Sequence, residues 1–117
     1  MPCVFCQIVK GKIPAEIVYQ DNDFVVFKDI HPSAKIHLLV VPRRHIKSIN
    51  SLRRKDKEFI GQMILTAQKV AKKMKIAQKG YKLVFNVGRG GGQVIDHLHL
   101  HLLAGKLSSN AKKSIVI

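Results

Sequence analysis

Three histidines alternate with leucines in residues 97–103, which read HLHLHLL. Successive side chains of a strand point to opposite faces, so this pattern places His97, His99 and His101 on one face and leucines on the other. Packing alone explains such a row poorly, because every buried imidazole needs hydrogen-bond partners. Two chemistries could use it: alternate histidines can ligate one metal ion, or one imidazole can attack phosphorus while a neighbour holds or releases the proton.

A glycine-rich loop stands directly before the histidines, with glycines at 88, 90, 91 and 92. Glycine lets the backbone come close to an oxyanion and present N–H groups to it. A glycine run is also typical of a flexible turn. Its place beside the three imidazoles favours phosphate chemistry over metal chemistry for this face.

Cys3 and Cys6 form a C-x-x-C motif. Two thiols cannot form the disulfide framework of a secreted domain. A redox motif would need a strand before it and a helix after it, and this one stands almost at the first residue, so a redox role is less favoured. The spacing also fits half of a zinc site, whose other ligands would come from elsewhere in the chain.

Periodicity and turn signals predict the elements that position these groups. We expect a short helix over residues 4–10, strands over 17–20, 24–28, 36–41, 82–86 and 97–103, and a long helix over 53–75. The order predicts one domain over residues 1–117, of the α+β class, with an antiparallel meander sheet of about five strands, one long helix and a short N-terminal helix. Residues 106–117 are expected to form a flexible tail.

The composition fits one globular domain, with 117 residues of which 46% are hydrophobic. No apolar run approaches the roughly 20 residues of a membrane span, and the N-terminus lacks a signal-peptide pattern, so we expect a cytoplasmic protein without membrane contact. The net charge of +14 suits anionic partners. Because lysines dominate and no arginine-rich or aromatic-interleaved stripe occurs, nucleic acid is a less favoured partner than a nucleotide.

The chain resembles the histidine-triad (HIT) nucleotide-binding proteins, on the Hint branch. That family has three histidines alternating with apolar residues and followed by two apolar residues, as at 97–103 here. Further similar segments are FCQIV at 5–9, IPA at 13–15, FKDI at 27–30, HLLVVP at 37–42 with HI at 45–46, GY at 80–81 before Asn86, and GGQ at 91–93. The resemblance covers roughly residues 3–105.

The resemblance implies a site for a purine nucleotide or nucleotide conjugate. By position, His99 would be the nucleophile on the α-phosphorus, with His101 and His37 supporting the phosphate and the proton transfers. The residues implied to bind the nucleotide or its leaving group, besides His99 and His101, are Phe5, Ile8, Ile13, Phe27, Asp29, Ile30, Asn86, Gly92, Gln93 and Val94. Asp29 would accept hydrogen bonds from the ribose, Asn86 and Gln93 would contact the phosphate and leaving group, and Gln93 is counted with the catalytic residues. Each apolar residue of the set is equally compatible with a plain place in the core.

The resemblance also implies a structural zinc ion and no organic cofactor. In family members that keep C-x-x-C, the ligands stand at the positions of Cys3, Cys6, His45 and His97, a closed tetrahedral set. The alternative is two reduced thiols and a solvated His45.

One position departs from the family pattern. Ser or Thr usually follows the Gly-Gln pair, and here Val94 does. The lost hydroxyl is worth about 1–2 kcal/mol, or about tenfold in rate. His31 also stands where Ser is common. These changes bear on efficiency and leaving-group preference, and not on the nucleophile.

These observations together predict a hydrolase of nucleoside 5′-phosphoramidates or similar conjugates that works through a nucleotidyl-histidine. One alternative is a dinucleoside polyphosphate hydrolase or nucleotidyl transferase, which the intact C-x-x-C segment disfavours. Another is a non-catalytic nucleotide or nucleic-acid binding module, prompted by the charge and Val94. The resemblance further implies a homodimer through the long helix and the strand at 82–86, and the two apolar stripes of that helix support it.

Overall fold

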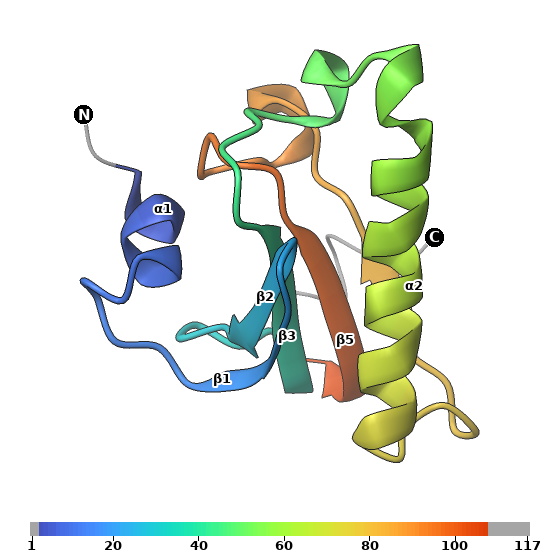
Figure 1. The fold of residues 1–117 in the computed structure, drawn as a ribbon. Coiled ribbons are helices and arrows are strands. Elements are labelled where there is room, and N and C mark those ends of the chain that lie inside the picture. Colours follow the sequence, from blue (N-terminus) through green and yellow to red (C-terminus); the bar gives the residue numbers. More distant parts are fainter. Residues whose placement is uncertain (1–2, 108–117) are drawn as a thin grey trace.

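The computed structural model of the chain describes residues 3–107. Its five strands form one antiparallel sheet in the order β1-β2-β3-β5-β4 (Figure 1). The strands are β1 (Ile17–Gln20), β2 (Phe24–Lys28), β3 (Ala34–Pro42), β4 (Lys82–Val84) and β5 (Leu100–Leu107). The helices are α1 (Val4–Val9) and α2 (Lys57–Lys73), with 3-10 turns at Ile49–Ser51, Arg54–Asp56 and Arg89–Gly91. The predicted α+β class with a five-stranded antiparallel sheet is confirmed. The strand order departs from a simple meander, because β5 inserts between β3 and β4 and pairs with both.

The sheet is buried on both faces, by α2 on one side and α1 on the other (Figure 1). The α2 side takes alternate strand residues and one stripe of the helix, namely Phe24, Val26, Leu38, Val40, Leu100 and Leu102 with Met63, Ala67, Val70 and Ala71. The α1 side takes the other set, Val25, Phe27, Leu39 and Val41, with Phe5. This two-sided burial explains why β2 reads FVVF without polar alternation. No helix in the described part of the chain is long and apolar enough to cross a membrane.

The histidine–leucine alternation works as predicted, although the strand begins later than predicted. Leu98, Leu100 and Leu102 pack in the α2-side core, while the ring of His99 lies against Phe5 on the α1 side. The ladder starts only at Leu100. Before it, the N–H of Leu98 bonds to the Ile46 carbonyl at 2.6 Å instead of to a strand partner.

Other boundaries also differ from the prediction. β3 runs over Ala34–Pro42, longer than 36–41, because it pairs along its length with β2 and β5. β4 ends at Val84 instead of residue 86, and the first turn of the predicted long helix is the 3-10 turn Arg54–Asp56. α2 ends before Lys75, whose φ of 62° is left-handed. β5 includes Lys106 and Leu107, the first two residues of the predicted tail, and residues 108–117 lie outside the described residues.

The packing of α2 generates a stability prediction. Met63→Ala is expected to lower the free energy of unfolding by about 2–5 kcal/mol, because this fully buried side chain would leave a cavity between helix and sheet. Gln68→Ala, at an exposed position of the same helix, is the control and should change it by less than about 0.5 kcal/mol. Urea unfolding followed by circular dichroism measures both. Equal effects of the two substitutions would contradict this orientation of α2.

Candidate functional site

A pocket of about 430 Å³ opens on the α1 side of the sheet. Apolar side chains form one part of its wall, among them Phe5, Ile8, Ile13, Phe27, Leu39 and Ile95. Polar side chains form another part, among them Asp29, His37, Asn86, His99 and His101. Ile30 and Val94 complete the rim and are 84% and 80% exposed. Every residue predicted to bind the nucleotide lines this pocket except Gln93.

His99 has one nitrogen committed to the backbone and one free. Its Nδ1 lies 2.7 Å from the carbonyl oxygen of His97, and a carbonyl only accepts, so Nδ1 carries the proton. The neutral ring therefore has its lone pair on Nε2. Within residues 3–107, His99 Nε2 has no hydrogen-bond partner and is accessible to solvent. Burial lowers the pKa of His99, which outweighs the opposing effects of the His97 carbonyl and Asp29 and keeps the ring neutral at pH 7.

His37 of β3 and His101 of β5 form a hydrogen-bonded pair whose protons can be assigned. The Ser33 N–H donates to His37 Nδ1 at 2.9 Å, so the neutral ring of His37 carries its proton on Nε2. This Nε2 lies 2.9 Å from His101 Nδ1 and donates to it, which leaves His101 protonated on Nε2. Burial, assisted by His99 and His37, lowers the pKa of His101 to about 4. At neutral pH the pocket therefore holds one imidazole acceptor, on His99, and one imidazole donor, on His101.

Asp29 supplies a carboxylate beside this pair. Its Oδ2 lies 3.4 Å from His37 Nε2, and its Oδ1 accepts from the His31 N–H at 2.8 Å. The ligand atoms of Asp29, His37 and His101 are close enough together to hold a metal ion. The Ser33 hydrogen bond opposes that use, because it keeps a proton on the His37 nitrogen that would have to bind the metal.

The glycine loop brings backbone close to this polar wall. Gly92 has a φ of 86°, a conformation that favours glycine, and a Cβ there would lie 3.5 Å from Asn86 Nδ2. Asn86 Nδ2 in turn donates to the Gly91 carbonyl at 2.8 Å. The loop is therefore shaped by its own contacts, with Asn86 and Gly92 on the pocket surface.

Gln93 does not reach the pocket in this structure. Its side chain is only 2% exposed. Its Nε2 donates to the carbonyls of Lys47 and Ile95 at 2.8 and 2.9 Å, and its Oε1 accepts from the Gly88 N–H at 3.0 Å. These contacts hold the glycine loop in place, so any effect of Gln93 on a ligand in this conformation is exerted through the loop.

Some contributors were missed by sequence reasoning. The Ser33 N–H orients His37, but a backbone group has no side-chain signal by which it could be found. Arg89 and Asp96 brace the glycine loop through a two-pronged ion pair, with distances of 2.9 and 3.1 Å. Opposite charges seven residues apart across a glycine run are a weak signal for such a pair.

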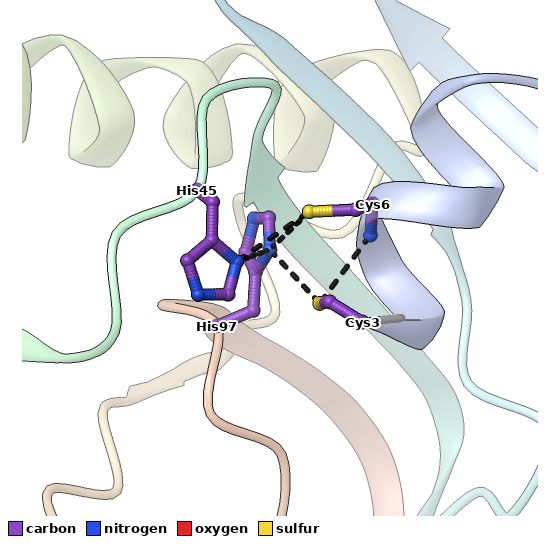
Figure 2. Close-up of side chains that lie close together, drawn as sticks. All are labelled: Cys3, Cys6, His45 and His97. Carbon is purple, nitrogen blue, oxygen red and sulfur yellow. Dashed lines mark hydrogen bonds between the residues drawn. The ribbon is translucent and has the colours of Figure 1, made fainter. Parts of the chain in front are cut away.

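Cys3, Cys6, His45 and His97 converge beside α1 (Figure 2). The Sγ atoms lie 3.3–3.5 Å from histidine Nδ1 atoms, and the two Nδ1 atoms lie 3.1 Å apart. With Zn–S of about 2.3 Å and Zn–N of about 2.0–2.1 Å, a tetrahedral ion would separate S and N ligands by about 3.5 Å and two N ligands by about 3.3 Å. The observed distances match the edges of such a tetrahedron.

The surroundings of His97 fit the same use. Its Nε2 lies 2.8 Å from the Pro42 carbonyl, so the neutral ring carries its proton there and turns the Nδ1 lone pair toward the sulfurs. Burial lowers the pKa of His97 and keeps the ring neutral. Burial also raises the pKa of the Cys6 thiol, with Cys3 adding to the effect, and a bound cation would reverse that shift. The four donors therefore form a chemically complete zinc set.

The chain is similar to several known proteins in sequence and in fold. Residues 2–117 match the family described as scavenger mRNA decapping enzyme C-term binding. The chain is 40% identical over 103 residues to the purine nucleoside phosphoramidase of Escherichia coli (strain K12), covering 88% of this chain and 87% of that one. Its structure matches a HIT family hydrolase from Legionella pneumophila Philadelphia 1 with a TM-score of 0.87 and 44% identity, covering 90% and 94% of the two chains. It also matches a Zn-bound histidine triad family protein from Mycobacterium smegmatis with a TM-score of 0.79 and 30% identity, covering 91% and 76%. The chain belongs to the histidine-triad (HIT) family.

Proposed function

We propose that this protein hydrolyses nucleoside 5′-phosphoramidates or similar nucleotide conjugates through a nucleotidyl intermediate on His99. The observation that carries the proposal is the bond from His99 Nδ1 to the His97 carbonyl, because it leaves Nε2 with a lone pair and access to the pocket. An E. coli relative at 40% identity bears the name purine nucleoside phosphoramidase, which supports the same reaction class.

The pocket has the parts that a nucleoside monophosphate requires. Its volume of about 430 Å³ lies within the usual range of small-molecule sites, about 300–1,000 Å³. Phe5, Ile8 and Phe27 offer an apolar slot for a purine ring. The Asp29 carboxylate can accept hydrogen bonds from both ribose hydroxyls, and the His101 Nε2–H can donate to the phosphate.

The reaction then has two displacement steps at phosphorus. His99 Nε2 forms a bond to the α-phosphorus as the bond to the leaving nitrogen breaks, and that nitrogen takes a proton from solvent and departs as the amine. The His97 carbonyl stabilises the positive charge that develops on the attacking ring. His101 Nε2–H, the imidazole donor in the pocket, stabilises charge on the phosphoryl oxygens. Water then attacks phosphorus and gives up a proton to solvent, the bond to His99 Nε2 breaks with its electron pair returning to that nitrogen, and the nucleoside monophosphate leaves.

Replacing the nucleophile tests this proposal. His99→Asn is expected to lower turnover of adenosine 5′-phosphoramidate by about 10⁴-fold or more, since loss of a nucleophile removes the covalent route. Binding of adenosine 5′-monophosphate, measured by calorimetry, should persist. Gln68→Ala, at an exposed position of α2 outside the pocket lining, serves as the control.

Retention of more than about a tenth of the turnover by His99→Asn would contradict nucleophilic catalysis by this residue. Running diadenosine polyphosphate beside the phosphoramidate distinguishes the related enzyme classes, because faster cleavage of the dinucleotide would favour the polyphosphate hydrolase. Nucleotide binding without turnover of either compound would favour the non-catalytic module.

The His37–His101 pair predicts an acid-shifted pH dependence. Burial lowers the pKa of both rings below the ordinary value of 6.5, to about 4 for His101, so the neutral pair should survive below pH 6.5 and be lost as pH falls toward 4. The decline of kcat on the acid side of its pH profile should therefore lie between pH 6.5 and about pH 4. Asp29→Asn removes a charge that raises both pKa values, so this decline should move to lower pH. A decline at or above pH 6.5, or a shift to higher pH in Asp29→Asn, would contradict the assignment.

We also propose that Cys3, Cys6, His45 and His97 hold one structural zinc ion per chain. The ion would join α1 to the segments that follow β3 and precede β5. Reduced thiols of this kind suit the cytoplasmic location expected from the sequence.

Elemental analysis of protein purified without a metal-binding tag should find about one zinc per chain. Cys3→Ser combined with Cys6→Ser should remove it, because two of four ligands are lost. His101→Gln, on the catalytic face, should keep it. Zinc that survives the double substitution but is lost in His101→Gln would place the metal at Asp29, His37 and His101 instead.

Finally, we propose a homodimer formed through α2 and β4. β4 is an edge strand of the sheet, and open edges need covering. Leu83 on β4, and Ile64 and Leu65 on α2, are 37%, 43% and 52% exposed, an apolar set that a two-fold partner would bury.

Light scattering at micromolar protein should give about twice the chain mass of 13.2 kDa. Because each chain carries a net charge of +14, association should be at least as strong in high salt as in low salt. A mass of 13.2 kDa at every salt concentration would rule out the dimer.

A further inference from the structure

We infer that metal binding at Cys3, Cys6, His45 and His97 and nucleotide binding in the pocket strengthen each other, with Phe5 as the positioning residue between the two sites. The inference rests on the proposed nucleotide site and on the fit of the four ligands to zinc. It concerns the free energy that couples the sites, which neither site implies alone.

Phe5 lies between the two cysteines in sequence and between the two sites in space. Its ring makes edge-to-face contacts with His97, a proposed metal ligand, and with His99, the proposed nucleophile, at centroid distances of 5.8 and 5.1 Å. It contacts Phe27, another residue of the pocket lining, in the same way at 5.6 Å. Although it lines the pocket, the side chain is only 4% exposed. A displacement of Phe5 would therefore disturb both clusters at once.

The helix that carries Phe5 is too short to hold its own position. α1 has six residues, far below the roughly 12–15 at which an isolated helix becomes even marginally stable in water. The two sulfur ligands are its N-cap residue Cys3 and Cys6 in its first turn, and its apolar contacts with the sheet come from Phe5 and the partly buried Ile8 and Val9. A metal ion bound through Cys3 and Cys6 would therefore fix one wall of the nucleotide pocket.

A second connection runs through the backbone of His97. The ring of this residue offers Nδ1 to the metal cluster, while its carbonyl oxygen accepts from His99 Nδ1 at 2.7 Å. A metal that holds the ring limits the movement of that carbonyl, and so limits the direction of His99 Nε2. In the other direction, a nucleotide that contacts Phe5 and Ile8 keeps α1, and with it Cys3 and Cys6, in place.

Coupling of this kind is reciprocal, so it can be measured as zinc affinity without any turnover. The full chain, loaded with zinc, is titrated with a chromogenic chelator in the absence and in the presence of saturating adenosine 5′-monophosphate. We expect the nucleotide to raise zinc affinity by about fivefold or more, the usual lower bound of such coupling. Calorimetry of zinc-loaded and chelator-stripped protein should give the same factor for nucleotide affinity.

Variants on α1 test the route. Phe5→Ala keeps all four metal ligands, and we expect saturating nucleotide to change its zinc affinity by a factor close to one. Phe5→Leu, which keeps an apolar contact, should retain part of the increase in zinc affinity. Gln7→Ala, on the same helix but outside the pocket lining, should leave the factor unchanged. If removal of zinc unfolds the whole chain, any ligand of the folded state will raise zinc affinity. In that case the nucleotide will still raise the zinc affinity of Phe5→Ala. That result would overturn the role of Phe5.

The remaining outcomes separate this inference from the function proposed above. A factor of one in the unmodified chain, with normal nucleotide binding, would overturn the coupling and leave the nucleotide site standing. Failure of the zinc-loaded chain to bind the monophosphate at all would contradict the nucleotide site itself, and the coupling with it.

Discussion

The hydrogen bond from His99 Nδ1 to the His97 carbonyl decides which nitrogen of the central histidine faces the pocket. A neutral imidazole has one proton, and a carbonyl can only accept, so this contact of 2.7 Å leaves the lone pair on Nε2. The irregular segment before β5 holds the carbonyl in place. There the Leu98 N–H donates to the Ile46 carbonyl and the His97 ring donates to the Pro42 carbonyl. Because of these contacts, strand pairing of β5 begins only at Leu100. The departure from strand geometry is thus the feature that turns Nε2 of His99, the proposed nucleophile, toward the pocket.

Burial and long-range charge have different effects at this site. The chain carries a net charge of +14, yet burial lowers the pKa of His37, His99 and His101, so the rings in the pocket are neutral at pH 7. The excess lysines can attract an anionic substrate from a distance, an effect that weakens with salt. Inside the pocket, the proposed recognition of a nucleotide depends on individual donors and acceptors, among them His101 Nε2–H and the Asp29 carboxylate.

Much of this architecture could be predicted from the sequence because it depends on local periodicity. The alternation of histidine and leucine correctly separated the core-facing leucines from the histidines of the opposite face, and the strands predicted at 17–20 and 24–28 match β1 and β2. Local periodicity could not predict that Cys3 and Cys6 lie beside His97, because about ninety residues separate them in sequence. Only the family resemblance indicated that grouping. The Ser33 contact to His37 and the inward turn of Gln93 were missed, because each depends on backbone partners that residue types do not reveal.

The stereochemical outcome at phosphorus tests the central claim most directly, because it reports the number of displacements whatever the rates. A nucleoside 5′-phosphoramidate made chiral at the α-phosphorus with sulfur is hydrolysed in isotopically labelled water, and the configuration of the product is determined. Attack by His99 followed by attack by water inverts the centre twice, so the account predicts net retention. Net inversion would mean a single direct attack by water and would contradict a covalent intermediate on His99.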